Sequence, residues 1–222
     1  MTPFDKLHQL AASRKGGAAK LNKLIGKPKS KAALAKIPDD RWLSEMAKAV
    51  FRAGFNWTVV ENKWPDIEAA FEGFEPRQIA AYSDEELEQL LKDPRVIRQW
   101  RKLKAIRANA NYVCELAEEH GSAARYFAHY PSNDYIGLLD DLKKRGSYLG
   151  GTTAQYFLRM MGRDSFILSN DVIAALEREK AFAGSPTSKS SLRSIQAAFN
   201  FWVDDGGKSL TRVSRILAFT VG

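Results

Sequence analysis

Apolar residues recur at intervals of three and four along most of the chain, which is the period of an amphipathic helix. One clear stripe lies between Asp39, which is expected to cap a helix, and Gly54, which is expected to end it. The apolar members of this stripe are Trp42, Leu43, Met46, Val50 and Phe51. This pattern predicts a helix that buries one face.

Similar stripes predict further helices over residues 68–74, 97–120, 123–130, 135–144, 153–161, 172–178, 191–203 and 210–219. The first of them follows Pro65, a residue that suits the first turn of a helix. Ser83 and Glu86 have the spacing of a capping box ahead of Leu87. Trp64 and Trp100 lie on apolar stripes and are expected in the core. Because no stretch sustains the two-residue alternation of a strand, the predicted fold class is all-α.

Residues 1–38 differ from the rest in charge. They hold nine of the 34 Lys and Arg residues but only one acid, Asp5, so they carry the whole net charge of +8. Weak helical patterns are broken there by glycines and by Pro28. We expect a basic N-terminal arm or lobe over residues 1–38 and a main domain over residues 39–222. Such a segment suits a polyanion, although a solvated basic face explains the charge nearly as well.

A single cysteine, Cys114, in 222 residues rules out an internal disulfide and any site built from several cysteines. No signal peptide and no stretch of about 18 apolar residues is present. We expect a cytoplasmic protein that needs no metal and no cofactor.

A glycine-rich turn separates the predicted helices 135–144 and 153–161. Gly150 and Gly151 permit a tight turn, and Thr152 and Thr153 follow at the start of the second helix. This arrangement is typical of a helix-hairpin-helix, in which the amides that open the second helix face a DNA phosphate. A plain helical turn is the alternative.

Asp171 follows an apolar run, residues 166–168, and precedes a predicted helix. A helix N-cap is the commonest role of an Asp in such a place. A carboxylate anchored at a helix start is also held rigidly enough to face developing positive charge, and both interpretations remain open.

Four blocks, at residues 53–60, 71–76, 96–106 and 143–153, resemble the bacterial 3-methyladenine DNA glycosylase I family in the same order. The resemblance covers about residues 42–161. Residues 162–172 are similar to the wider helix-hairpin-helix DNA glycosylase superfamily. The resemblance implies two helical lobes around a cleft, double-stranded DNA with damaged bases as partner, hydrolysis of the N-glycosidic bond in base excision repair, and Asp171 as the catalytic carboxylate.

The resemblance also assigns roles to other residues. Trp57 matches the stacking Trp of the base pocket, with Trp42 and Tyr156 as weaker neighbours. Phe55 and Asn56 are the candidates for the wedge that fills the gap left by an extruded base, although Phe55 could instead be a core aromatic. Thr152 stands where bifunctional relatives carry a Schiff-base Lys, which implies a monofunctional enzyme.

The chain departs from the family pattern in two respects. One Cys and three His cannot supply the two-Cys, two-His zinc site. Ala49 stands where the base-reading Glu is expected, so recognition should depend on stacking by Trp57 and separate 3-methyladenine from 7-methylguanine less sharply. Two alternatives remain: a non-catalytic helix-hairpin-helix DNA-binding module, or a helical factor whose basic arm binds an acidic protein.

Overall fold

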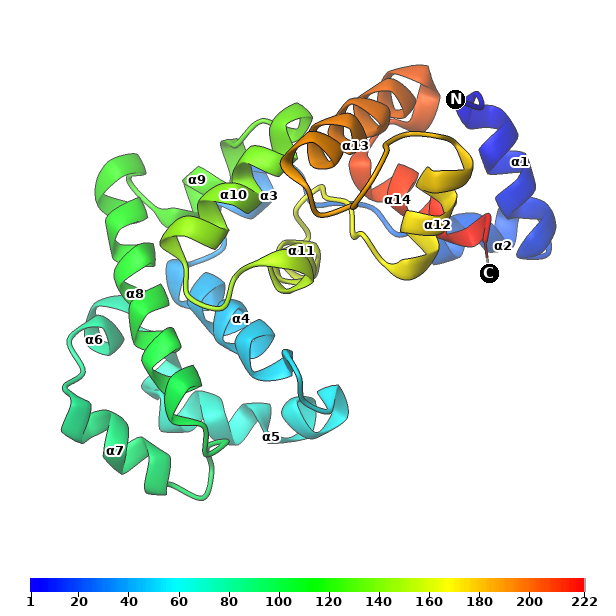
Figure 1. Cartoon of the computed structure of the whole chain (residues 1–222). Coiled ribbons are helices and arrows are strands. Elements are labelled where there is room, and N and C mark those ends of the chain that lie inside the picture. Colours follow the sequence, from blue (N-terminus) through cyan, green and yellow to red (C-terminus); the bar gives the residue numbers. More distant parts are fainter. Residues whose placement is uncertain (222) are drawn as a thin grey trace. The chain divides into compact units, whose positions relative to one another are not determined.

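The computed structural model describes residues 1–221, and the elements found there are helices joined by turns (Figure 1). The helices are α1 (Phe4–Arg14), α2 (Ala18–Ile25), α3 (Lys31–Ala35), α4 (Asp39–Arg52), α5 (Trp57–Ala70), α6 (Pro76–Ala80), α7 (Asp84–Lys92), α8 (Trp100–His120), α9 (Ala123–His129), α10 (Tyr135–Arg145), α11 (Gly151–Met161), α12 (Asn170–Arg178), α13 (Lys189–Trp202) and α14 (Leu210–Phe219). Short 3₁₀ turns η1 (Glu72–Phe74) and η2 (Ser132–Asp134) and a π-helical turn η3 (Val203–Gly207) complete them. The predicted all-α class is confirmed.

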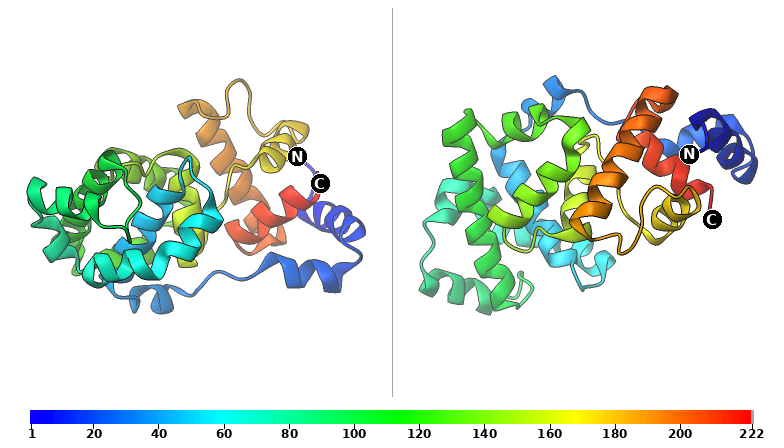
Figure 2. Two further views of the ribbon diagram at one scale, coloured as in Figure 1. Left: turned by 90° about the horizontal axis from the view of Figure 1, so that it is seen from below. Right: turned by 45° about the horizontal axis from the view of Figure 1, so that its top comes forward.

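The chain forms two compact units. Unit 1 combines residues 1–29, 130–138 and 162–222, and unit 2 combines residues 30–129 and 139–161. This division differs from the expected boundary between residues 38 and 39. Of the helices in the basic N-terminal segment, α1 and α2 belong to unit 1, where α1 lies beside α14 (Figure 2), and α3 belongs to unit 2. Asp205 accepts a hydrogen bond from the backbone N–H of Phe4 at 2.7 Å, and the Trp202 indole donates to the carbonyl of Thr2 at 2.9 Å.

An aromatic cluster forms the centre of unit 2. Phe127 on α9 stacks on Trp42 of α4, with ring centroids 4.8 Å apart, and meets Phe157 of α11 edge-on at 5.8 Å. Tyr112 of α8 also packs edge-on against Phe127, at 6.5 Å. These four side chains are at most 1% exposed. One buried ring therefore joins four helices.

Unit 1 has a second aromatic core. Phe166 stacks on Phe199 with centroids 4.1 Å apart and packs edge-on against Tyr135 at 4.7 Å. Asp164 accepts hydrogen bonds from the backbone N–H groups of Leu210 and Thr211, which satisfies donors at the start of α14. Both contacts fix the segment that leads into α12.

Three helix boundaries differ from the sequence prediction. Asp39 does not cap its own helix: its carboxylate accepts from the backbone N–H groups of Ala123 and Ala124 and so caps α9. The helix expected after Pro65 begins eight residues before it, because Asn56 accepts hydrogen bonds from the N–H groups of Thr58 and Val59 and starts α5 at Trp57. The long helix expected from residue 97 begins at Trp100.

The capping box of α7 is confirmed. Ser83 accepts from the backbone N–H of Glu86 at 3.2 Å, and the Glu86 carboxylate accepts from the N–H of Ser83 at 2.7 Å. Of the two tryptophans expected in the core, Trp64 is buried and Trp100 is half-buried. Within residues 1–221, no helix is long and apolar enough to cross a membrane.

The Phe127 cluster predicts a large stability effect. Replacing a fully buried Phe by Ala leaves a cavity, so Phe127→Ala should lower the free energy of unfolding by about 3–5 kcal/mol. Phe201→Ala, which truncates a ring that is 44% exposed, is the control and should change it by less than about 0.5 kcal/mol. Urea denaturation followed by circular dichroism measures both, and equal effects would contradict a central role for Phe127.

Candidate functional site

A pocket of about 180 Å³ lies entirely within unit 2, where α4 ends and where α5 and α11 begin. Its lining residues are Ala49, Arg52, Ala53, Gly54, Trp57, Thr152, Thr153 and Tyr156. Drug-sized ligands occupy roughly 300–1,000 Å³, so this pocket suits a smaller group, on the scale of one nucleobase. Trp57 and Tyr156, both predicted for the base pocket, are thus brought together by the fold.

Two aromatic rings give the pocket its shape. Trp57 and Tyr156 meet edge-on, with centroids 5.0 Å apart and an interplanar angle of 86°. Trp57 is 40% exposed, so it retains an open surface for stacking. Trp42, the third predicted pocket residue, is instead fully buried against Phe127 and does not line the pocket. Its place on the apolar face of α4 directs it into the core.

A buried lysine fixes the turn between α4 and α5. Lys102 of α8 is 6% exposed, and its ammonium donates to the carbonyls of Phe51 at 3.0 Å and Ala53 at 2.7 Å. A cation suits the carbonyls that end a helix, while burial lowers the pKa of Lys102. Gly54 then takes a positive φ of 70°, which reverses the chain.

The predicted wedge residues follow this turn. Phe55 is 37% exposed, so it is not the core aromatic that the alternative interpretation required. Asn56 caps α5 with its side chain, which gives it a structural role beside the one predicted for it. Both residues lie in the turn between α4 and α5, which is held by Lys102 on one side and by the Asn56 cap on the other.

Arg52 is a pocket residue that the sequence analysis did not single out. It is 7% exposed, donates to Glu45 at 2.8 Å and to Glu61, and places its guanidinium carbon 5.2 Å from the centroid of the Trp57 ring. Its Nε–H is buried and has no hydrogen-bond partner among the described residues. The spacing of Glu45, Lys48 and Arg52 along one face of α4 is the signal that could have found it.

A second cation, Lys48, helps to balance the charge of the two carboxylates that pair with Arg52, Glu45 and Glu61. Lys48 contacts Glu61 at 2.6 Å. Burial acts to raise the pKa of Glu61, but hydrogen bonds from Lys48 and Arg52 hold that pKa below its ordinary value. For Glu45 burial prevails and raises the pKa, against the attraction of Arg52. Two cations thus face two carboxylates beside the pocket.

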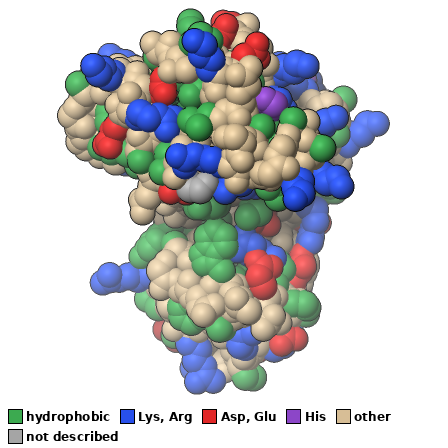
Figure 3. All heavy atoms as spheres, turned by 90° about the vertical axis from the view of Figure 1, so that its right-hand side faces the viewer, with side chains coloured by type: hydrophobic (Ala, Val, Ile, Leu, Met, Phe, Trp, Pro, Cys, Tyr) green, Lys and Arg blue, Asp and Glu red, His purple; other side chains and the backbone are tan. Residues whose placement is uncertain are grey.

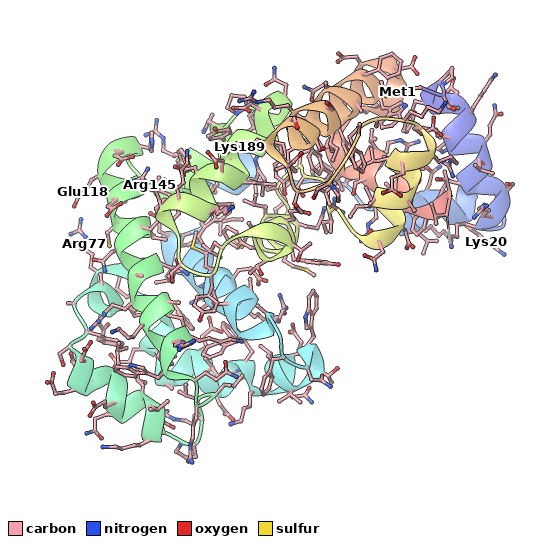
Figure 4. The ribbon with its side chains drawn as sticks, in the orientation of Figure 1. Met1, Lys20, Arg77, Glu118, Arg145 and Lys189 are labelled. Carbon is pink, nitrogen blue, oxygen red and sulfur yellow. The ribbon has the colours of Figure 1, made fainter. Side chains whose placement is uncertain are left out.

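The glycine turn between α10 and α11 is anchored to α8. Asn109 donates to the carbonyl of Ser147 at 3.1 Å and accepts from its N–H at 2.7 Å, and Leu149 is fully buried. Arg145, labelled in Figure 4, ends α10 and pairs with Glu115 and Glu119 of α8. These contacts anchor the turn to α8.

Of the four predicted phosphate-binding residues, Gly150 directly precedes α11 and the other three open it. Gly151 is its first residue and has a φ of +56°, and Thr152 is exposed beside it. Gly150 and Thr153 are half-buried. Thr152 and Thr153, at the start of α11, thus line the same pocket as Trp57. No lysine is among the pocket's lining residues within the described chain.

Asp171 lies in unit 1, in the first turn of α12, and is exposed. It is not the N-cap: Ser169 fills that role and accepts from the N–H of Val172. The capping alternative for Asp171 is therefore excluded, whereas its catalytic role stays a prediction.

Residues 1–29 of the basic N-terminal segment belong to unit 1, and Lys and Arg side chains are spread over the face of the protein in Figure 3. Lys20, Lys23, Lys27 and Lys29 belong to this segment, and all four are exposed. In the described part of the chain, no group of three or more His, Cys, Asp or Glu side chains is placed to hold a metal ion.

Comparisons with known proteins identify the fold and the family. Residues 36–139 match the model of the methyladenine glycosylase family. The chain is 30% identical to DNA-3-methyladenine glycosylase 1 of Escherichia coli (strain K12) over 131 residues, which are 50% of this chain and 70% of that protein.

Comparison with solved structures supports the same fold. One of 3-methyladenine DNA glycosylase I superposes with a TM-score of 0.51 at 25% identity, over 61% of this chain and 81% of the other. The Staphylococcus aureus enzyme gives 0.51 at 22% identity, over 56% and 77%, and supports the fold alone. Since the E. coli relative aligns over more than two thirds of its length, the chain belongs to the methyladenine glycosylase family.

Proposed function

We propose that this protein is a monofunctional DNA glycosylase that hydrolyses the N-glycosidic bond of damaged bases, alkylated purines among them, in double-stranded DNA. The observation that carries the proposal is the pocket formed by Trp57, Tyr156 and the start of α11 in a member of this family. The E. coli relative is named for its action on 3-methyladenine.

The geometry supports base extrusion. A base taken out of the stack needs an aromatic surface, and stacking is worth about 1–3 kcal/mol per base. Trp57 offers such a surface, and Phe55 lies two residues away in the fixed turn. An exposed apolar ring in that place can enter the space between base pairs that the extruded nucleotide leaves.

The chemistry requires an anion near the deoxyribose. Cleavage passes through an oxocarbenium-like transition state, whose positive charge a carboxylate stabilises. Asp171 is our candidate for this role and for orienting the attacking water. Asp171 lies in the first turn of α12 and is exposed, so its carboxylate is accessible to a substrate.

Two further features fit this proposal. A bifunctional enzyme needs a Lys that forms a Schiff base with the sugar, but the pocket holds Thr152 there. The start of α11 presents backbone N–H groups that suit a phosphate. Because Ala49 supplies no hydrogen bond to a base, 3-methyladenine and 7-methylguanine should be released at rates closer to each other than a carboxylate-bearing pocket allows.

A base-release assay tests the proposal directly. Duplexes that carry methylated bases are incubated with the protein, and abasic sites are then cleaved with alkali. Cleavage that requires the alkali step is expected, since a monofunctional enzyme leaves the backbone intact. Salt-dependent DNA binding without any base release would favour the non-catalytic module.

Asp171→Asn should retain DNA affinity and lower the single-turnover rate of base release by about 10²–10³-fold, because the charge acts in the transition state. Glu177→Gln is the matched control, since it neutralises another exposed acid of α12. Equal rates for Asp171→Asn and the parent would remove Asp171 from the mechanism.

Gly151→Val should weaken binding to damaged and undamaged duplexes alike, by about tenfold, because the side chain would project from the first residue of α11. Gly184→Val controls for strain, since both glycines have positive φ and open space around a Cβ. Affinities are measured by fluorescence anisotropy. A weakening confined to damaged DNA would place Gly151 in lesion recognition instead.

The basic segment should contribute to binding through interactions with phosphates. Replacing Lys20, Lys23 and Lys27 by Gln should lower DNA affinity and reduce the slope of log affinity against log salt by about 1–3, because each phosphate that a lysine neutralises adds roughly 0.9 to that slope. A salt titration measures the slope. An unchanged slope would show that these lysines form a solvated face only.

A further inference from the structure

The charge that lines the pocket has a consequence for substrate range. Arg52 is the only charged side chain among the pocket's lining residues in the described chain, and no carboxylate lines it. Its two acidic neighbours, Glu45 and Glu61, are matched by Arg52 together with Lys48. A base that enters the pocket therefore meets a hydrogen-bond donor and no anionic acceptor.

Arg52 is also held in a fixed orientation. Its two terminal nitrogens donate to different carboxylates, and its guanidinium lies against Trp57, with 5.2 Å between the guanidinium carbon and the ring centroid. The side chain is nine-tenths buried, and its Nε–H has no partner among the described residues. Because Arg52 lines the pocket, its guanidinium can donate to an acceptor on a ligand without any further ordering of the side chain.

The charge of the departing base decides which substrates gain from such a donor. When the glycosidic bond of a cationic N-alkylated purine breaks, the bonding electrons neutralise the base, and a nearby cation gives no advantage. When the base is neutral, the same electrons leave it as an anion. Water then adds its oxygen to C1′, and the proton that the water loses ends on the base.

Resting on the proposed glycosylase function, we propose that Arg52 extends the substrate range of this pocket to neutral, carbonyl-bearing purines, of which hypoxanthine is the simplest. Arg52 donates to an acceptor atom of the extruded base and stabilises the negative charge that develops on it as the bond breaks. Trp57 supplies the stacking surface for the purine ring.

The test uses two duplexes, one with a single hypoxanthine opposite thymine and one with a single 7-methylguanine. Single-turnover release is measured for the parent, Arg52→Met and Arg52→Lys. Arg52→Met should lower hypoxanthine release at least tenfold and raise the ratio of 7-methylguanine to hypoxanthine release by the same factor. Arg52→Lys keeps the charge and should recover part of the activity.

Two controls keep the test decisive. Glu45→Gln combined with Arg52→Met avoids leaving a buried carboxylate without its partner, so the ratio can be measured in a folded protein. Arg98→Met removes an exposed Arg outside the pocket and should change neither rate. Quenching of tryptophan fluorescence by free hypoxanthine measures binding without catalysis, and Arg52→Met should weaken it.

The outcomes separate the two proposals. Release of 7-methylguanine but not hypoxanthine by the parent, or a ratio unchanged in Arg52→Met, overturns the role of Arg52 and leaves the glycosylase function intact. Release of neither base, with no base release from any methylated duplex, overturns the glycosylase function. Quenching by free hypoxanthine that depends on Arg52 would still support the pocket's preference in that case.

Discussion

The stacking of Trp42 on Phe127 is the contact on which the arrangement of unit 2 depends. Phe157 and Tyr112 meet the same ring, so α4, α8, α9 and α11 share one buried centre. Interiors pack as densely as organic crystals, and a helix cannot shift there without opening space. The pocket lies where α4 ends and α11 begins. The dense packing around Phe127 therefore holds the pocket walls in place, although none of the four clustered aromatic side chains lines the pocket.

Two buried cations near the end of α4 show how the site departs from an apolar interior. Lys102 is satisfied by the carbonyls of Phe51 and Ala53, and Arg52 is largely satisfied by Glu45 and Glu61. Burying a charge without partners costs several kcal/mol. Several hydrogen bonds thus hold the turn between α4 and α5. Such support by polar contacts is expected around a functional site, whereas an interior that serves only stability is mainly apolar.

Most of the longer helices were predictable because their apolar residues recur at helical spacing over several turns, and the capping box at Ser83 is a local signal. The helices α3 and α6, with five residues each, are too short to show such a pattern. The prediction for Asp39 was wrong because a carboxylate beside a helix start reveals nothing about a second helix, here α9, that folds against it. Trp57 and Tyr156 were found through the family resemblance. Arg52 was not, since Glu61, one of its two partners, lies on another helix, and the spacing of Glu45, Lys48 and Arg52 on α4 is equally typical of a solvent-exposed charged face.

Unit 1 is assembled from three stretches of sequence, and this has a consequence for biosynthesis. Its helices α1 and α2 are synthesised well before their partner α14. Phe4, Leu7 and Leu21, all buried in the finished fold, lack the apolar surface of α14 during that interval. Unit 2 is complete at residue 161 and can fold earlier. Until α14 is made, the nascent chain therefore exposes this apolar surface, and exposed apolar surface favours aggregation of folding intermediates.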